Sequence, residues 1–160
     1  MKGIRKFLDK SLEFVGILIL MVMIITVLYQ IFTRTVLNNP NTVTEELVRF
    51  CMVWISLLAS AYVVGKQQHL AVTLLSEKLN DRNRHILDLV IQVLFVLFST
   101  IIMIYGGIKG VSITMNQISP SLSLPMGYVY LAVPVSGVIM LIYSVLNLID
   151  CIFNKQSQEE

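Results

Sequence analysis

Charged residues are scarce in this chain, and the long apolar stretches carry none at their middle. Asp, Glu, Lys and Arg make up 14% of the 160 residues, whereas hydrophobic residues make up 56% and the mean hydropathy is +0.77. This composition is typical of an integral membrane protein. An intramembrane acid usually marks a proton or ion path. Because the chain lacks one at mid-depth, we do not expect it to transport anything on its own.

Motifs of enzymes and metal sites are also missing. There is no Gly-rich phosphate loop and no nucleophile elbow, and His69 and His85 have no Cys or carboxylate at metal-ligand spacing. The two cysteines, Cys51 and Cys151, fall at opposite ends of predicted spans. A disulfide needs Cα atoms within about 7 Å, so these two cannot pair within one chain. We therefore predict no enzyme activity, no cofactor, no bound metal and no nucleic-acid partner.

Four apolar runs predict an all-α integral membrane protein with four transmembrane helices. Each of three runs has about the 20 residues that a spanning helix needs. The uncharged second run, Phe50 to Val64, rises only about 22 Å at 1.5 Å per residue, which is less than the bilayer core of about 30 Å. Its helix must therefore begin upstream, near Val43. The predicted spans are about 13–34, 43–65, 87–109 and 125–150, in one membrane domain covering 1–160.

Basic residues predict the orientation, because cytoplasmic segments are enriched in Lys and Arg. They gather before the first span and between the second and third, at Lys2, Arg5, Lys6, Lys10, Lys66, Lys78, Arg82 and Arg84. Both termini are therefore expected in the cytoplasm. A cleaved signal peptide is the competing interpretation of residues 1–32, but the apolar run is too long and no small-residue cleavage site follows it.

The N-terminal segment shows the pattern of an amphipathic helix lying on a membrane surface. Ile4, Leu8, Leu12 and Val15 recur at helical spacing beside basic residues, which predicts an interfacial helix over about 2–12. Leucines between the second and third spans have a similar pattern, at Leu70, Leu74, Leu75 and Leu79. Anchoring by lipid phosphates and binding of a partner both remain open for these segments.

Polar residues crowd the start of the second span. Thr42 followed by Glu45 fits a capping box, and Glu45 with Arg49 forms an i,i+4 pair. Glu46 is left over by these local explanations. We therefore predict a wider polar network at the outer end, in which Arg49 pairs with Glu46.

Small and special residues give three further site predictions. Ser56 and Ser60 fall on the same side of the helix as Arg49, where they let another helix approach closely, either within the chain or from another subunit. Lys66 and His69 mark the cytoplasmic end of the second span. Pro134 is expected to kink the fourth helix.

Taken in order, these residues resemble the small membrane subunit of tripartite ATP-independent periplasmic (TRAP) transporters, the DctQ-like proteins. The similarity covers nearly the whole chain. It is carried by Asn39-Pro40, Glu45-Glu46, Arg49, Trp54, Lys66, His69, Leu124-Pro125-Met126-Gly127 and Pro134. The chain departs from the family pattern at Val43, where tryptophan is usual before the acidic pair, and at Ala59, where glycine is common.

The resemblance implies a non-catalytic subunit of a sodium-coupled importer of organic acids, such as sialic acid or C4-dicarboxylates. It would sit in the bacterial inner membrane as a scaffold beside a large multi-span subunit that holds the sodium and substrate sites. A periplasmic substrate-binding protein would dock on the outer face, and membrane lipids would surround the complex. The expected interface or outer-face network is Glu45, Glu46, Arg49, Trp54, Ser56 and Ser60.

Two other functions remain as alternatives. A stand-alone four-helix proton-coupled exporter, acting as a homodimer, would depend on Glu46 and need no larger partner. A membrane redox protein is the weaker alternative and would depend on Cys51.

Overall fold

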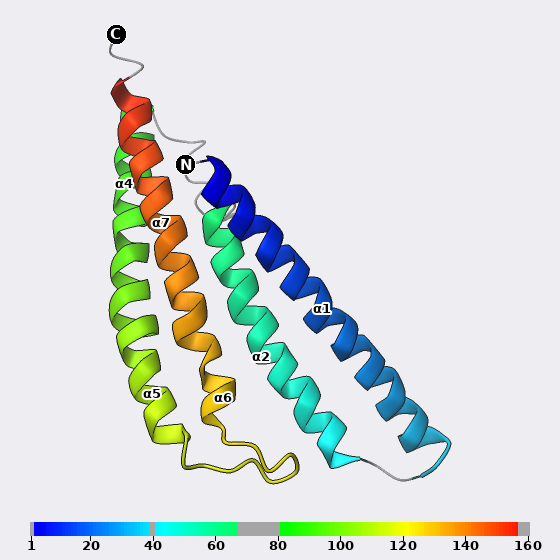
Figure 1. Cartoon of the computed structure of the whole chain (residues 1–160). Helices are drawn as coiled ribbons and strands as arrows, with labels where there is room; N and C mark the ends of the chain where they lie inside the picture. The colour runs from blue at the N-terminus through cyan, green and yellow to red at the C-terminus, as the bar shows by residue number, and fades with distance from the viewer. Residues whose placement is uncertain (1, 39–40, 67–80, 157–160) are drawn as a thin grey trace.

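The computed structural model describes residues 2–38, 41–66 and 81–156, and these are almost entirely helical (Figure 1). The elements are α1 (Lys2–Thr35), α2 (Thr42–Gly65), α4 (Asp81–Leu97), the π-helix η1 (Phe98–Gly106), α5 (Gly107–Thr114), α6 (Gly127–Tyr130) and α7 (Ala132–Gln156). Four stretches are long and apolar enough to cross a membrane: Gly3–Thr35, Thr42–Gly65, Ile86–Thr114 and Gly127–Cys151. The predicted all-α fold with four spans is therefore confirmed. His69, Asn39, Pro40 and the leucines between the second and third spans lie outside the described residues.

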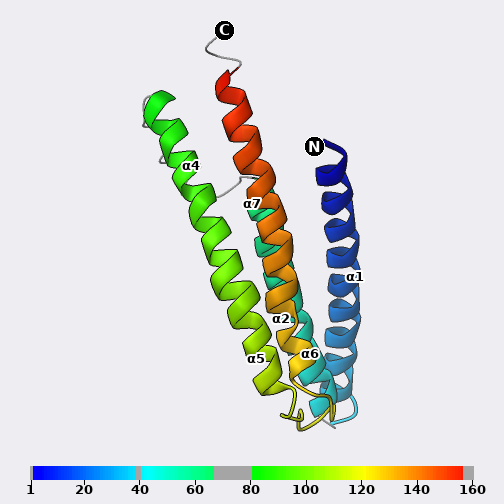
Figure 2. The same ribbon diagram turned by 60° about the vertical axis from the view of Figure 1, so that its left-hand side comes forward.

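The helices lie side by side in an order that differs from their order in the chain. α7 packs against α2 on one side and against α4 and η1 on the other, and α1 packs against α2 (Figures 1 and 2). In the most apolar 18-residue window of each span, 44% of the residues are buried in the fourth span, but none in the first. The fourth span is therefore the centre of the assembly, and α1 lies at its edge.

Two apolar clusters fill the contacts between neighbouring helices. One joins Ala61 and Val64 of α2 to Met103 of η1 and Met140 of α7. The other cluster, at the contact of α1, α2 and α7, consists of Leu12, Leu58 and Tyr143. Both clusters include residues of α2 and α7, so this pair forms the core of the protein.

The N-terminal segment is not a separate interfacial helix. Residues 2–12 form the first turns of α1, which continues without a break to Thr35. The segment is helical, as its periodicity predicts, but the surroundings of its apolar face differ from the prediction. Leu8 packs against the second apolar cluster, and Leu12, 9% exposed, belongs to it. These leucines face the protein's own helices instead of lipid, which keeps the segment in line with the span.

The third and fourth spans approach each other closely near the π-helix of the third span and just after a break in the fourth. A Cβ atom built on Gly137 would lie 2.6 Å from Cβ of Met103, and one on Gly107 would lie 2.9 Å from Cδ of Pro134. The fourth span is interrupted at Leu131, between α6 and α7. Pro134 accounts for this break, because it has no N–H for the carbonyl of Tyr130 one turn earlier.

Candidate functional site

The start of α2 is fixed by Asn41, one residue before the predicted cap. The Asn41 Oδ1 atom accepts a hydrogen bond of 3.0 Å from the backbone N–H of Val43. The hydroxyl of Thr44 donates to the carbonyl of Asn41 at 2.8 Å. The prediction that Thr42 caps the helix is therefore wrong by one residue, because the Asn41 side chain satisfies the free amide instead.

Arg49 pairs with Glu45, and the predicted pair with Glu46 is wrong. The Arg49 guanidinium donates to Glu45 Oε1 across one helical turn. The two side chains are 73% and 53% exposed, so this pair adds little to stability. Its place on the surface leaves Arg49 available to a partner.

Glu46 turns toward a distant part of the same chain. Its Oε2 atom accepts hydrogen bonds from the backbone N–H groups of Ser121, at 3.0 Å, and Leu122, at 2.9 Å. The loop from Met115 to Met126, here called the 115–126 loop, joins the third and fourth spans. Glu46 therefore links the start of α2 to the tip of this loop, so the predicted polar network joins parts of one chain.

The 115–126 loop has its own internal order. The amide of Ser119 donates to the carbonyl of Leu124 at 2.9 Å, and that of Met126 donates to Gln117 at 2.8 Å. Ser123 adopts a positive φ of 54°, which closes the turn between these bonds. Ser119 is only 2% exposed. Glu46 thus binds a turn that is also closed by its own backbone hydrogen bonds.

The remaining residues predicted on α2 point in different directions. Ser56 and Ser60 are exposed, and their hydroxyls donate to the helix carbonyls of Met52 and Ser56, at 2.7 and 2.8 Å. Trp54 is half-buried against the cluster of Leu12, Leu58 and Tyr143. The serines are therefore free to meet another molecule, whereas Trp54 packs within the chain.

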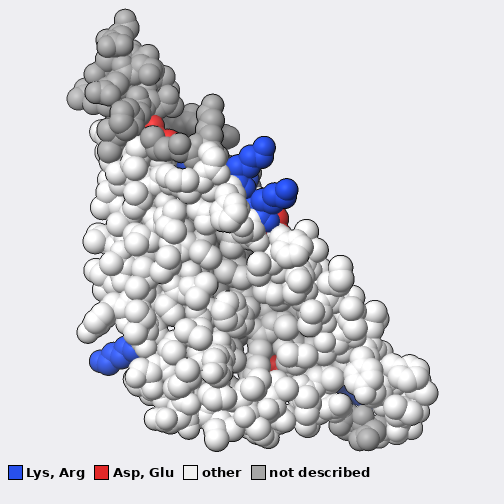
Figure 3. Space-filling view, in the orientation of Figure 1, with Lys and Arg blue, Asp and Glu red and all other residues white. Residues whose placement is uncertain are grey.

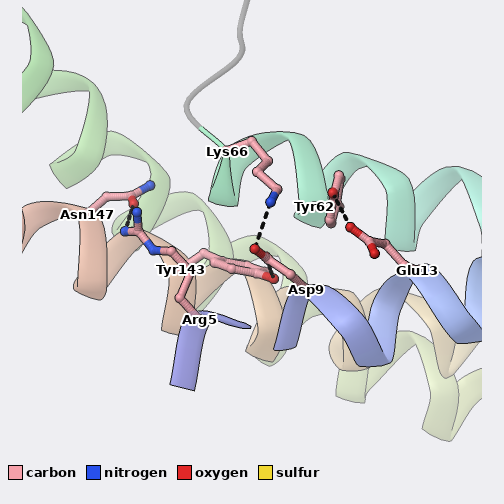
Figure 4. A network of polar contacts seen from close by, with 7 residues as sticks. All are labelled: Arg5, Asp9, Glu13, Tyr62, Lys66, Tyr143 and Asn147. Carbon is pink, nitrogen blue, oxygen red and sulfur yellow. Dashed lines mark hydrogen bonds and ion pairs between the residues drawn. The ribbon is translucent and has the colours of Figure 1, made fainter. Parts of the chain in front are cut away.

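The largest polar network among the described residues lies at the opposite end of the molecule, and the sequence analysis missed it. We call it the polar clamp; its members are Arg5, Asp9, Glu13, Tyr62, Lys66, Tyr143, Asn147 and Asp150. Its centre is Asp9 of α1, whose carboxylate accepts from Lys66 Nζ at 2.7 Å and from the Tyr143 hydroxyl at 2.6 Å (Figure 4). One carboxylate thus joins α1, the end of α2, and α7.

Four more hydrogen bonds complete the polar clamp. Arg5 donates to Oδ1 of Asn147 and, at 3.1 Å, to Asp150. The Asn147 amide donates at 3.1 Å to the carbonyl of Val64, near the end of α2. A separate bond of 2.7 Å runs from the Tyr62 hydroxyl to Glu13, and Tyr143 and Asn147 are both fully buried. Buried polar groups of this kind are held in place only when each finds a partner.

The hydrogen bond that Lys66 donates to Asp9 raises the pKa of Lys66 above its ordinary value of 10.5. Because the pKa of Lys66 is higher in the folded than in the unfolded protein, the Lys66–Asp9 pair contributes its full stabilisation at any pH below the ordinary pKa of Lys66. Its contribution is lost only as the pH rises through the higher, folded-state pKa of Lys66. Near neutral pH, Lys66 therefore stays charged, and its titration does not weaken the contact with Asp9.

Two sequence signals could have revealed the polar clamp. Arg5, Asp9 and Glu13 stand four residues apart at the start of α1, so they share one helical face. Tyr143 and Asn147 have the same spacing in the fourth span. The basic residues served only to predict the orientation in the membrane, and Lys66 only to predict the end of the second span.

The contact between Gly65 and Tyr143 gives a direct test of this packing. A Cβ atom at Gly65 would lie 2.5 Å from Cδ1 of Tyr143, whose ring is fixed by burial and by its bond to Asp9. We expect Gly65→Ala to push α2 and α7 apart and to destabilise the protein by about 1–3 kcal/mol, as overpacking does. Thermal unfolding in detergent would measure this loss.

Gly110→Ala is the matched control, because nothing lies within 4 Å of a Cβ built at Gly110. Alanine there should be neutral or stabilising, since it favours helix by up to about 1 kcal/mol over glycine. Equal unfolding temperatures for the two variants would show that α2 and α7 are not in close contact at Gly65.

Known proteins similar to this chain point to one family. Residues 23–154 match the family described as tripartite ATP-independent periplasmic transporters, DctQ component. A TRAP transporter small permease protein of Haemophilus influenzae is 28% identical over 153 residues, which cover 96% of this chain and 94% of that protein. The sialic acid TRAP transporter small permease protein SiaQ of Vibrio cholerae is 27% identical over 93 residues, 58% of this chain and 54% of SiaQ.

A longer relative contains a similar segment. The isethionate TRAP transporter permease protein DctMQ of Oleidesulfovibrio alaskensis is 32% identical over 94 residues, which cover 58% of this chain but 15% of that protein. The family match covers most of this chain and agrees with the resemblance noted in its residues. The chain therefore belongs to the DctQ family of tripartite ATP-independent periplasmic transporters, as a multi-pass transporter component and not an enzyme.

Proposed function

We propose that this chain is the static small subunit of a sodium-coupled organic-acid importer, packed beside a larger permease protein in the inner membrane. The observation that carries the proposal is an exposed strip on α2, here called the α2 face, made of Glu45, Arg49, Met52, Ser56 and Ser60. Support also comes from DctMQ, in which a segment similar to this chain forms a small part of a longer permease.

The α2 face has the chemistry of a helix-packing surface. The hydroxyls of Ser56 and Ser60 already donate to carbonyls of their own helix. Another helix can therefore cover them without leaving a buried hydroxyl that lacks a hydrogen-bond partner. Their small size lets a second backbone approach closely, as at many membrane helix contacts. Glu46 and Trp54 do not belong to this surface, because both are engaged within the chain.

The finer parts of the function follow from the charge distribution. None of the four apolar runs has an acidic or basic side chain at its middle, so we assign the sodium and substrate sites to the larger subunit. We assign the end that holds Lys66 to the cytoplasm, because basic residues are concentrated near it and cytoplasmic segments are enriched in Lys and Arg. The Glu46 end then faces the periplasm, where a substrate-binding protein would deliver an organic acid such as sialic acid.

Reconstitution tests the proposal as a whole. Liposomes containing this chain together with its larger partner should accumulate the organic acid under a sodium gradient when the binding protein is supplied. Liposomes with this chain alone should accumulate none. Uptake by the chain alone would overturn the scaffold role.

Reversing the charge of Arg49 tests the α2 face. Arg49→Glu would set two carboxylates one helical turn apart, at Glu45 and position 49, and repel the surface that Arg49 contacts. We expect at least about a fivefold loss of co-purifying larger permease, equivalent to about 1 kcal/mol of binding free energy. Thermal stability of the chain should change by less than about 0.5 kcal/mol, since the site is exposed.

Arg34→Glu is the control for this prediction, because Arg34 is an exposed basic residue in the last turn of α1. It should leave co-purification and uptake unchanged, and Glu45→Gln should have a smaller effect than Arg49→Glu. Full retention of the larger permease by the Arg49→Glu variant would remove Arg49 from the interface.

A further inference from the structure

We propose that the groove between α1 and α2 binds one anionic phospholipid, with an acyl chain in the groove and the phosphate at Lys6 and Lys10. The groove has a volume of about 320 Å³ and a lining that is almost wholly apolar. Its walls include Gly16, Ile17 and Leu20 of α1, and Ile55 and Ala59 of α2.

The groove opens where hydrocarbon is expected. Both of its walls belong to helices that are long and apolar enough to cross a membrane. Its floor is low because Gly16 has no side chain, and nothing lies within 4 Å of a Cβ built there. A flexible acyl chain fits such a furrow, because it fills irregular apolar space without needing hydrogen-bond partners.

Two lysines precede the lining residues of the groove on α1. Lys6 and Lys10 lie seven residues before Glu13 and Ile17 respectively, and a spacing of two helical turns keeps them on the same face of α1. Both are exposed. Figure 3 shows basic side chains projecting together over the first turns of α1, above a surface that is mostly uncharged.

These lysines differ from the other basic groups nearby. Arg5 and Lys66 are paired with Asp150 and Asp9. Among the residues that the structure describes, Lys6 and Lys10 have no ion-pair partner.

The net charge of this end complements a singly charged headgroup. Glu13 lies at the mouth of the groove, but its Oε1 accepts the bond from Tyr62. Two ammonium groups and one carboxylate leave a net charge of +1, which matches the single negative charge of phosphatidylglycerol. Lysines beside an apolar surface bind anionic lipid in this way, with their stems along the hydrocarbon.

Native mass spectrometry of the full-length chain in detergent tests the proposal. The protein is titrated with phosphatidylglycerol and, separately, with phosphatidylcholine of the same acyl chains. We expect one phosphatidylglycerol per chain, bound at least about five times more tightly than phosphatidylcholine. The double variant Lys6→Gln/Lys10→Gln should lose this preference, whereas Lys109→Gln, which removes an exposed lysine of α5, should keep it. Equal binding of both lipids by the unaltered chain would overturn the headgroup site.

Filling the groove tests the acyl-chain site independently. Gly16→Leu should abolish the bound phosphatidylglycerol, whereas Gly110→Leu should not, because both glycines have open space around them but only Gly16 lines the groove. Retention of the lipid by Gly16→Leu would overturn the groove assignment.

Crosslinking in the native membrane identifies the occupant directly. A photoreactive benzophenone side chain at position 20 should add the mass of one phospholipid to the full chain. A product with the mass of two chains, or of the chain joined to a larger protein, would show that a helix occupies the groove and overturn the lipid proposal.

Discussion

Replacing Glu46 by Ala is expected to free the 115–126 loop from α2. Two backbone amides, those of Ser121 and Leu122, would lose a charged acceptor at 3.0 and 2.9 Å. The Ser121 amide would lose this acceptor outright, whereas the Leu122 amide would keep only a longer bond of 3.3 Å to Ser119 Oγ, so the loop is held less firmly. Hydrogen exchange should become faster at these two amides, and the unfolding temperature of the chain should fall.

Glu45→Ala is the neighbouring control. Glu45 is exposed, and within the described ranges its one ion pair is with Arg49 across one turn, a type of contact that contributes about 0.3–0.5 kcal/mol. Exchange at Ser121 and Leu122 should not change in this variant. The assignment of Glu46 as the anchor of the loop would fail if the two variants exchanged and unfolded alike.

Replacing Asp9 by Leu is expected to have the second large effect, because it removes the acceptor at the centre of the polar clamp. The ammonium of Lys66 and the hydroxyl of Tyr143 would both lose their partner, and Tyr143 is fully buried. We expect a loss of about 2–3 kcal/mol, below the full cost of breaking a buried pair because the Lys66 side chain is 34% exposed.

Fluorescence of Trp54 provides a local measure of this change. It is the sole tryptophan of the chain and packs beside Leu12 and Tyr143, so its emission should shift when α1 loosens. Glu13→Gln is the control, since the amide oxygen can still accept the bond from Tyr62. An Asp9→Leu variant with unchanged emission and unfolding temperature would show that α1 is held by its apolar contacts alone.

The parts of the fold that the sequence predicts are those that depend on neighbouring residues. The sequence predicts the second span at 43–65, and α2 runs from Thr42 to Gly65. The two agree because hydropathy and the polar residues at the start of the span are local signals. The Glu45–Arg49 pair is local too. Glu46, by contrast, meets Ser121 across 75 positions, and Asp9 meets Tyr143 across 134. Such contacts depend on how the helices pack against one another, and the periodicity of a sequence does not predict that arrangement.

The N-terminal segment shows the same limit in another form. The spacing of Leu8 and Leu12 located a face of the helix, but it could not say what that face meets. Lipid was the expected neighbour because basic residues stand beside these leucines. The structure places α2 and α7 there, and the polar residues Arg5 and Asp9 on the same side bind those helices.

The position of α7 between α2 and α4 has a consequence for the order in which the protein is made. The ribosome completes α1, α2 and α4 before the last span, yet both apolar clusters and the polar clamp need residues of α7. Until Tyr143 and Asn147 arrive, Asp9 and Arg5 lack their α7 partners. A chain truncated before the fourth span would thus consist of the α1–α2 hairpin and a third span without its α7 contacts, and Arg5 and Asp9 would have no partner on α7.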